Sequence, residues 1–589
     1  MAATPSTVYL PVEARSIRLL HLDAGQHDDP IRFSLDSVSL DSNPRYEAIS
    51  YCWGSHNSRQ DVSCMGIPMS ITTSLGGALR EFRHSFMQRI LWVDGICIKQ
   101  DDENEKTCQV RLMQEIYAKA TLVLVEPGLI SDIANSDGRN GRPSIEQNDW
   151  NAISQLICRP WFTRKWVVQE IAMAREVRLH VGGGVQLPWL ELSSLVAKIY
   201  SFGVIPLIIK EVSSGEDGAF AVGLYHIMVM KNIAYGRLNG QGTLVDAAIR
   251  TRGFSCSDPR DHIYGLLSCA SEGPSVDPDY TLSIEETFKM FTQVMLKDGQ
   301  NLKVLSLEPH KSDRFHPRIP RDRTELPSWV SDLRRPADPM AKPSFNATSY
   351  HAGGPQKPVL RISDDGCLLH CQAIVVDEIE DLVPPMYEML LDEMPELFKS
   401  CSTSIIPSDP SPWRHRRRFQ RWLWACYNLG YRHASVLDKA SRKDAFSCTL
   451  LRDQGSSAGG QASAEMMSAT FKYVEYLLFK DETLSPAHRL DEMPKCPKLW
   501  AKIDTAIGQR CMMRSFSSTT GGRLGQMPIG TEEGDLICIL IGGEVPFVIR
   551  PTEPGSTKYH LIGDCFLNGA MNGEMLVPFQ NATREIILA

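Results

Sequence analysis

RILWVDGICI (89–98) is a mostly apolar run bounded by polar residues, which is typical of a strand buried on both faces of a parallel sheet. It is followed by DDENEKTCQVRLMQEIYAKA (101–120), whose acidic start and apolar residues at three- and four-residue spacing predict an amphipathic helix. TLVLVEP (121–127) predicts a second buried strand, which ends at a proline. This strand–helix–strand order favours a right-handed crossover in an α/β sheet.

The same pattern continues on both sides of this unit. YEAISYCW (46–53) predicts an earlier strand, and EVRLHVGG (176–183) predicts a closing one. Between them, WNAISQLICRPWFTRKWVVQEIAMA (150–174) predicts two helices separated by a proline break. We therefore expect a doubly wound α/β core over residues 46–183, inside an amino-terminal domain that spans residues 1–185.

The remainder of the chain has a different character. Helical patterns dominate residues 186–345, which predicts a mainly helical middle region. Residues 346–589 predict a mixed α/β region, with a strand pair around 359–378. Its end, 514–589, carries short apolar runs separated by Gly, Pro and Asn turns and is expected to be β-rich.

Composition narrows the class of protein. The 589 residues are 43% hydrophobic, which suits several folded domains and excludes a disordered chain or a collagen-like repeat. The net charge of −8 argues against nucleic-acid binding along the whole chain, because such binding needs a basic surface. No stretch approaches the ~20 apolar residues of a membrane span, and the start lacks a signal-peptide pattern. Sixteen cysteines without a CxxC pair suit a reducing compartment, so we expect a cytoplasmic protein without membrane contact.

Two further motifs have alternative interpretations. Arginines alternate with aromatic residues in WRHRRRFQRW (413–422), a pattern that can contact nucleic acid or anionic lipid. A solvated helix face paired with acidic neighbours is the favoured interpretation. GSSAG (455–459) matches the nucleophile elbow of hydrolases, but its small-residue surroundings favour a loop. No spacing of histidines and cysteines predicts a metal site.

Candidate binding residues follow the first two predicted strands of the core. Trp53 and Gly54 stand where the first predicted strand ends, and Asp94, inside the run 89–98, is assigned to the loop that leaves the second. Ligands of open α/β sheets bind beyond the carboxyl ends of the strands. We therefore expect these three residues to meet at that edge of the sheet.

Glu170 is the candidate acid. It follows Trp166 by four positions on a predicted helix, so the two side chains share one face. A carboxylate beside an indole is partly desolvated, which raises its pKa and suits it to stabilising a cation or transferring a proton. The aromatic ring could also stack on a nicotinamide or adenine ring. The alternative is a structural ion pair between Glu170 and Arg164 or Arg175.

Three blocks together resemble a known family. YEAISYCWG, ILWVDGICIKQDDENEKTCQVRLMQEIYAKATLVLV and RPWFTRKWVVQEIAMAREVRLHVGG resemble, in order and spacing, the blocks of the fungal heterokaryon-incompatibility (HET) domain. Stretches outside this core are also similar to full-length proteins of the family, among them SDPRDHIYGLL (257–267), VDPDY (276–280) and LPSWVSD (326–332). The resemblance spans most of the chain, but the outer stretches suggest no chemistry.

The resemblance implies a role in self/non-self recognition in filamentous fungi. Proteins of this kind trigger growth arrest or programmed cell death when incompatible hyphae fuse, a response comparable to innate immunity. An incompatible allelic protein or an immune receptor would then be the partner, and self-association is a further implied interaction. The alternatives are a non-enzymatic signalling or scaffold module and an accessory or regulatory protein of another fungal pathway.

The resemblance also implies a fold and a site. The HET domain is regarded as a distant relative of the Toll/interleukin-receptor domain, which has a flavodoxin-like parallel sheet flanked by helices. Some members of that wider class cleave NAD at the nicotinamide–ribose bond with a glutamate on the helix after the third strand. The block WVVQE looks like that helix, which implies a catalytic role for Glu170. Trp53, Gly54, Asp94 and Trp166 would bind the substrate, NAD, without a cofactor or metal.

Overall fold

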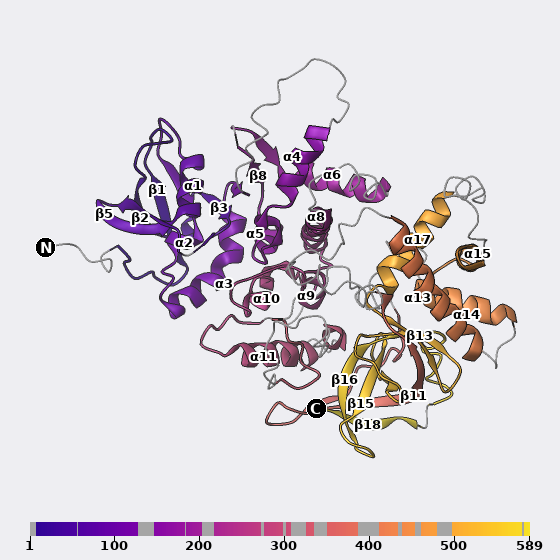
Figure 1. The fold of residues 1–589 in the computed structure, drawn as a ribbon. Helices are drawn as coiled ribbons and strands as arrows, with labels where there is room; N and C mark the ends of the chain where they lie inside the picture. Colours follow the sequence, from indigo (N-terminus) through magenta and orange to yellow (C-terminus); the bar gives the residue numbers. More distant parts are fainter. Residues whose placement is uncertain are drawn as a thin grey trace. The chain divides into compact units, whose positions relative to one another are not determined.

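A computed structural model describes most of the chain and divides it into two compact units (Figure 1). The first unit contains the described residues up to Thr287, and the second contains those from Phe288 onward. The predicted domain boundaries at residues 185 and 345 stay predictions. The described residues are 8–55, 57–127, 147–182, 184–202, 217–271, 276–297, 302–307, 326–334, 350–386, 412–433, 439–453, 461–479, 497–579 and 582–589.

The first unit is built on a nine-stranded mixed sheet. Its strands lie in the order β5-β4-β2-β1-β6-β3-β7-β8-β9. Their bounds are β1 Ser16–Leu22, β2 Arg32–Ser39, β3 Glu47–Tyr51, β4 Arg59–Cys64, β5 Ile67–Thr72, β6 Arg89–Trp92, β7 Val123–Glu126, β8 Val177–His180 and β9 Gln186–Pro188.

Four neighbouring strands of this sheet, β6, β3, β7 and β8, are parallel, which confirms the predicted α/β core. In chain order they lie second, first, third and fourth. The connection from β3 to β6 therefore runs to one side of β3, and the connection from β6 to β7 returns to its other side. Sheets with this order bind ligands beyond the carboxyl ends of the strands, here those of β3 and β7. The end of β3 places Ser50 and Tyr51 at this edge.

The sheet differs from a purely parallel one because strands before and between the predicted ones extend it. β1 pairs antiparallel with both β2 and β6, and β4 and β5 form an antiparallel pair beyond β2. No predicted strand covers β1, β2, β4 or β5. Polar residues interrupt the sequences of these strands, and buried positions in β2 are separated by more exposed ones. They therefore lack the continuous apolar run that marks a strand buried on both faces.

Helices connect the parallel strands. They are α1 Thr73–Phe82, α2 Asp94–Cys97, α3 Glu103–Lys119, α4 Gln147–Ile157, the 3-10 turn η4 Pro160–Thr163 and α5 Val167–Met173. The predicted helix over 101–120 is confirmed as α3, and its N-cap Asp102 accepts a hydrogen bond from the backbone N–H of Glu105. Every residue of α5 is buried. A helix buried on all sides takes its position from its packing partners, here α3, α8 and η5.

Further helices complete the first unit. They are α6 Trp189–Phe202, α8 Asp217–Leu238, α9 Leu244–Arg250, α10 Asp261–Tyr264 and η5 Leu267–Cys269, and α11 Ile284–Lys297 follows them into the second unit. The helical patterns predicted after residue 186 are therefore present. Helix α8 contacts α4, α5, α6 and η4, so it joins the elements around α5.

The second unit combines a closed ring of strands with a helical layer. Strand β11 pairs with both β14 and β18, so β11, β14, β15, β16 and β18 form a ring. The β-rich end is confirmed, and so is the strand pair near 359–378. The strands are β10 Leu360–Ile362, β11 Leu369–Val383, β12 Ser515–Thr519, β13 Leu524–Met527, β14 Leu536–Leu540, β15 Pro546–Pro551, β16 Lys558–Asp564, β17 Phe566–Leu567 and β18 Arg584–Leu588.

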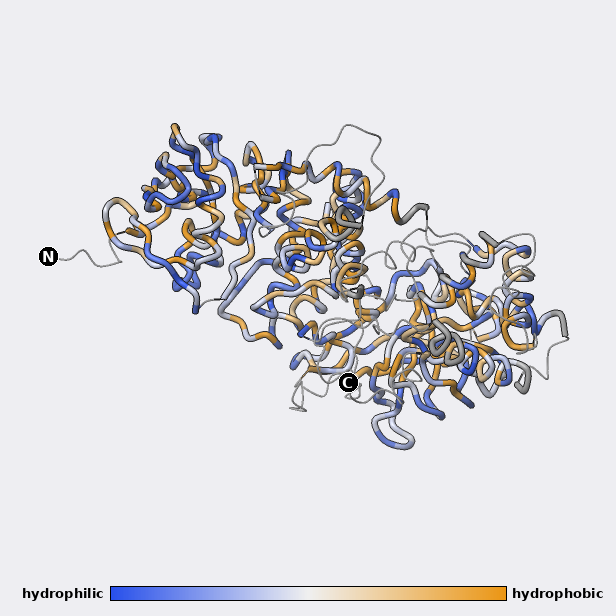
Figure 2. The backbone as a smooth tube through the Cα atoms, turned by 45° about the horizontal axis from the view of Figure 1, so that its top comes forward, coloured by the Kyte–Doolittle hydropathy of each residue, from blue (hydrophilic) through white to orange (hydrophobic). Residues whose placement is uncertain are grey.

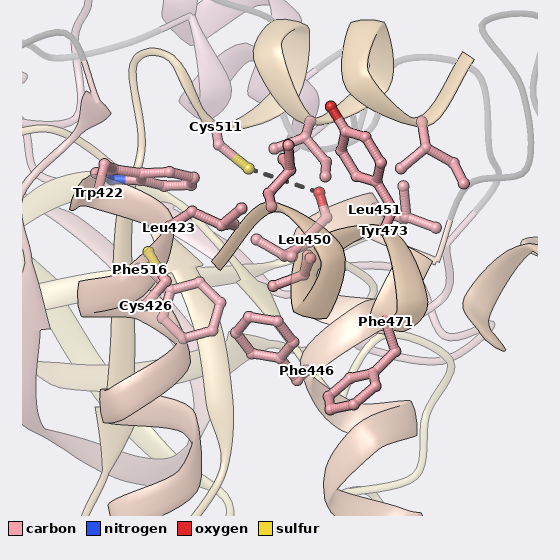
Figure 3. Packing of buried hydrophobic residues seen from close by; sticks show 14 of the residues in the cluster. Trp422, Leu423, Cys426, Phe446, Leu450, Leu451, Phe471, Tyr473, Cys511 and Phe516 are labelled. Carbon is pink, nitrogen blue, oxygen red and sulfur yellow. Dashed lines mark hydrogen bonds between the residues drawn. The ribbon is translucent and has the colours of Figure 1, made fainter. Parts of the chain in front are cut away.

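Among the described residues, the helices between β11 and β12 in the sequence are α13 Pro412–His433, α14 Lys439–Leu451, α15 Ala464–Phe479 and α17 Pro497–Cys511. Their apolar faces form one buried cluster with residues of β12 and β13 (Figure 3). Phe446 packs there against Phe471 and Phe516, and the Cys511 thiol donates a hydrogen bond to the Leu450 carbonyl oxygen at 3.6 Å. Large aromatic side chains dominate the energy of such cores.

Hydrophobic and hydrophilic segments alternate along the backbone in both units (Figure 2). This pattern suits elements that bury one face. Among the described helices, none has the length and apolar character of a membrane span. The basic run 413–422 lies in α13, but its side chains up to Arg418 are not among those that the structure describes. The GSSAG motif also lies outside the described residues.

Two glycines of α8 provide a test of the packing that holds the region of α5. A Cβ on Gly223 would lie 2.5 Å from the carbonyl oxygen of Ile157 in α4, whereas a Cβ on Gly236 would meet no atom within 4 Å. We expect Gly223→Ala to lower the free energy of unfolding by about 1–3 kcal/mol, because α8 must shift. Gly236→Ala should raise it by about 0.5–1 kcal/mol, because alanine stabilises an open helix position. Denaturant unfolding of both variants measures this, and equal effects would contradict the close approach.

Candidate functional site

Glu170 is joined to the end of β3 by a hydrogen-bond chain. The Ser50 hydroxyl donates to Oε2 of Glu170 and accepts a 2.7 Å hydrogen bond from Nε1 of Trp161. The Glu170 residue is 3% exposed, and both partners are buried as well. Residues from β3, η4 and α5 therefore meet at the carboxyl edge of the parallel strands, where the sequence analysis expected a site.

Burial decides the electrostatics of Glu170. Loss of hydration raises the pKa of its carboxyl group to about 7. The positive charge of Arg164 and hydrogen bonds from Ser50 and Tyr117 oppose this shift, while the negative charge of Asp94 adds to it. A group with this pKa can release or accept a proton near neutral pH.

Arg164 is the cation of the site. Its guanidinium donates to the carbonyl oxygen of Tyr51 at the end of β3. Burial disfavours its charge, but Glu170 and Asp94 outweigh that effect, and the pKa of Arg164 is raised. Of the two arginines that the structural alternative named, Arg164 is therefore the one that acts on Glu170, and Arg175 is exposed.

Asp94 and Trp53 form the second part of the site. Nε1 of Trp53 donates to Oδ2 of Asp94 at 2.9 Å, and the N–H of Gly95 donates to Oδ1 at 2.7 Å. Burial raises the pKa of the Asp94 carboxyl group, against the charge of Arg164 and the bond from Trp53. Gly54 is exposed and has φ +70°, a conformation that favours glycine. The loops after β3 and β6 thus meet as expected.

Trp166 has a different partner from the one its spacing suggested. Its Nε1 donates to Oδ2 of Asp261 at 2.9 Å, in the segment after α9. The indole that the hydrogen bonds link to Glu170 belongs to Trp161 instead. Four-residue spacing aligns Cβ atoms on a helix, but the larger indole turns toward the acceptor that it can reach.

Sequence reasoning missed four residues of this region, Ser50, Tyr117, Trp161 and Asp261. Ser50 could have been found, because it stands one residue before the end of the strand that leads to Trp53. Tyr117 and Trp161 carried the pattern of ordinary core residues. Asp261 lies too far along the chain for any local spacing to connect it with Trp166.

The arrangement combines two carboxyl groups with one guanidinium in a largely buried setting. Such groups can stabilise a developing cation and transfer a proton, and low hydration strengthens both effects. Within the described ranges, no three His, Cys, Asp or Glu side chains are grouped to hold a metal ion.

Comparisons with known proteins agree with the resemblance. Residues 46–170 match the heterokaryon incompatibility protein (HET) family, and residues 501–585 match the Het-6 beta-barrel domain. A relative from Neurospora crassa, heterokaryon incompatibility protein 6 (OR allele), is 22% identical over 675 aligned positions, which cover 97% of this chain and 95% of the relative. No solved structure gives a significant match.

The raised pKa of Glu170 predicts how stability depends on pH. Because its pKa rises from 4.5 to about 7 on folding, the folded chain binds more protons between these values, and stability falls as pH rises through them. Glu170→Gln removes this cost. We expect the unfolding free energy of the variant, minus that of the wild type, to increase by on the order of 2–3 kcal/mol from pH 5 to pH 8.

Urea unfolding at several pH values measures this difference, with Glu176→Gln as the control. Glu176 is exposed and pairs with Arg178 at 2.7 Å, so its variant should follow the wild type with pH. A constant offset between wild type and Glu170→Gln would contradict the raised pKa.

Proposed function

Because this chain is a HET-domain protein, we propose that it acts in fungal self/non-self recognition and triggers growth arrest or cell death. The relative in Neurospora crassa is named as an incompatibility protein and is similar along nearly its whole length. The partner in this proposal is an incompatible allelic protein or an immune receptor. The proposed place of action is the cytoplasm.

The chemical part of the proposal is cleavage of NAD at the nicotinamide–ribose bond, with Glu170 as the catalytic residue. The bond from Ser50 to Glu170 carries this proposal, because it brings the buried acid to the carboxyl end of β3. The order of the four parallel strands supports this proposal, because the resemblance implies a flavodoxin-like sheet of the kind in Toll/interleukin-receptor domains. Helix α5 also follows the third parallel strand, as the resemblance implies.

The reaction divides between bond cleavage and water attack. The C–N bond breaks with its electron pair on the nicotinamide nitrogen, so neutral nicotinamide leaves and the ribose becomes an oxocarbenium-like cation. The Glu170 carboxylate stabilises that cation, as carboxylates do in glycoside hydrolysis. Water then adds to the ribose carbon and loses a proton to Glu170, and the products are nicotinamide, ADP-ribose and one proton.

The other residues of the site bind and orient the substrate in this proposal. Trp53 supplies an aromatic face, Gly54 permits close approach to the backbone, and Asp94 holds the Trp53 indole. Trp166 stands one helical turn before Glu170. Since Glu170 is 3% exposed, NAD reaches it only when neighbouring side chains move, and this movement is part of the proposal.

The burial of Glu170 favours a second candidate function. A carboxyl group bonded to Ser50 and shielded from water can simply stabilise the fold of a signalling module. The domain would then act through self-association or partner contact, as a scaffold or as a regulator of another fungal pathway. The two functions differ in whether the charge of Glu170 is needed.

The test measures nicotinamide release by the purified full chain supplied with NAD. Wild type and Glu176→Gln should release nicotinamide, and Glu170→Gln should be slower by about 100-fold or more, because the amide cannot stabilise the cation as a carboxylate does. The same variants, expressed in a fungal host, should arrest growth only where turnover persists. Melting curves verify that each variant is folded.

Two results would decide against the enzyme. One is an absence of nicotinamide release by folded wild type with growth arrest retained in Glu170→Gln. The other is equal turnover by wild type and Glu170→Gln. The first of these results supports the scaffold function.

A further inference from the structure

The residues that lead into α5 are held by a distant part of the chain. The backbone N–H of Ser255 donates to the Thr163 carbonyl at 2.6 Å, and the N–H of Lys165 donates to the Ser255 carbonyl at 2.8 Å. These two bonds form a parallel bridge at Arg164. The start of α5 is thus fixed by main-chain bonds to a segment about ninety positions later in the sequence, and helix propensity alone does not set it.

Side chains strengthen this attachment. Lys165 is 1% exposed, and its ammonium donates to the Thr251 carbonyl at 2.9 Å and to the Thr251 hydroxyl at 2.6 Å. Burial lowers the pKa of Lys165 to about 7. Gly265 lies against the same residues, since a Cβ there would be 3.4 Å from Cγ of Lys165 and 3.5 Å from Cδ2 of Trp166.

Asp261 connects this attachment to a third stretch. Its Oδ2 accepts from Trp166 at 2.9 Å, and its Oδ1 accepts from the Tyr280 hydroxyl at 2.6 Å. Both oxygens of the buried carboxyl group are therefore bonded. Lys106 and Asp258 are its nearby charges, and they act in opposite directions on its pKa.

Tyr280 in turn is held between two cations. The Lys106 ammonium lies 4.0 Å from its ring centre and the Arg260 guanidinium 5.1 Å, which is the range of cation–π attraction. Arg260 also donates to the carbonyls of Tyr280 at 2.6 Å and Leu282 at 2.8 Å. Since Lys106 belongs to α3, the contacts run from α3 through Tyr280 and Asp261 to the start of α5.

We propose that the described residues of 251–282 form a clamp on α5, and that Asp261 is a positioning residue for Glu170. The link is short, because the backbone N–H of Glu170 donates to the carbonyl of Trp166 at 3.1 Å. A shift of Trp166 therefore moves the first turn of α5 and the bond from Ser50. The clamp lies outside the matched residues 46–170 and accounts for the outer motifs SDPRDHIYGLL and VDPDY.

The role of the clamp in catalysis rests on the proposed function, but its mechanical part does not. Hydrogen exchange of the α5 amides in the full chain reports the clamp without any substrate. In Asp261→Ala we expect these amides to exchange about tenfold faster or more, because two buried bonds are lost, while the amides of β7 keep their rates. Asp261→Asn should restore slow exchange, since its amide can accept from Trp166 and donate to the Tyr280 oxygen.

Turnover of NAD tests the positioning role. Asp261→Ala should lower kcat about tenfold with KM little changed, since misplacement of the acid affects the reacting step. Asp261→Asn should recover most of the rate. The matched control is Asp535→Ala in the second unit, a buried aspartate whose carboxylate bonds Arg550 at 2.7 and 2.9 Å. That variant should leave α5 exchange and kcat unchanged.

The outcomes separate the two proposals. If the α5 amides of folded Asp261→Ala exchange hydrogen at the wild-type rate, the clamp is overturned, whether or not the chain cleaves NAD. Faster exchange with unchanged kcat overturns the positioning role. Absence of turnover in the wild type overturns the proposed enzyme, and exchange then still decides on the clamp. Should Asp261→Ala fail to fold, Tyr280→Phe removes one of the two bonds and is measured in its place.

Discussion

The first unit depends on one constraint, the burial of a carboxyl group that must find partners inside the protein. A buried acid without hydrogen bonds costs several kcal/mol, so Glu170 requires donors at fixed places. Ser50 supplies one from β3, and Trp161 fixes the Ser50 hydroxyl in turn. The sheet, η4 and α5 are thereby tied together at the edge where α/β folds bind ligands. The same burial that demands these partners raises the pKa of the acid to about 7.

Hydrogen bonds between buried polar groups also fix the positions of the elements next to this site. The buried Lys165 ammonium donates to the carbonyl and the hydroxyl of Thr251, and the carboxyl group of Asp261 accepts from Trp166 and Tyr280. Each bond is costly to break and holds only in one arrangement. Helix α5 is too short to be stable alone. Its position is therefore set by contacts with a segment that lies many residues later in the sequence.

The sequence predicted what is local and continuous. The run 101–120 has a clear helical period and is confirmed as α3, and the apolar run 121–127 is confirmed as β7. The predicted strand over 89–98 is wrong in its second half, because only Arg89–Trp92 is strand and Asp94–Cys97 forms the helix α2. The residue pairs of the site are a different matter: Trp53 and Asp94 could be expected to meet because parallel strands end at one edge. The Trp166–Asp261 bond could not, since 95 residues separate the two and nothing in their spacing marks the contact. Roles inferred for Glu170 and its neighbours come from the resemblance and stay predictions.

The ring of strands in the second unit has a consequence for synthesis. Strand β11 is translated before its partners β14 and β18, which follow only after the described helices α13, α14, α15 and α17. Until β18 is translated, β11 keeps unpaired backbone groups, which are prone to wrong pairing. A stop codon placed before β18 would therefore leave the ring open, and the truncated protein should be defective.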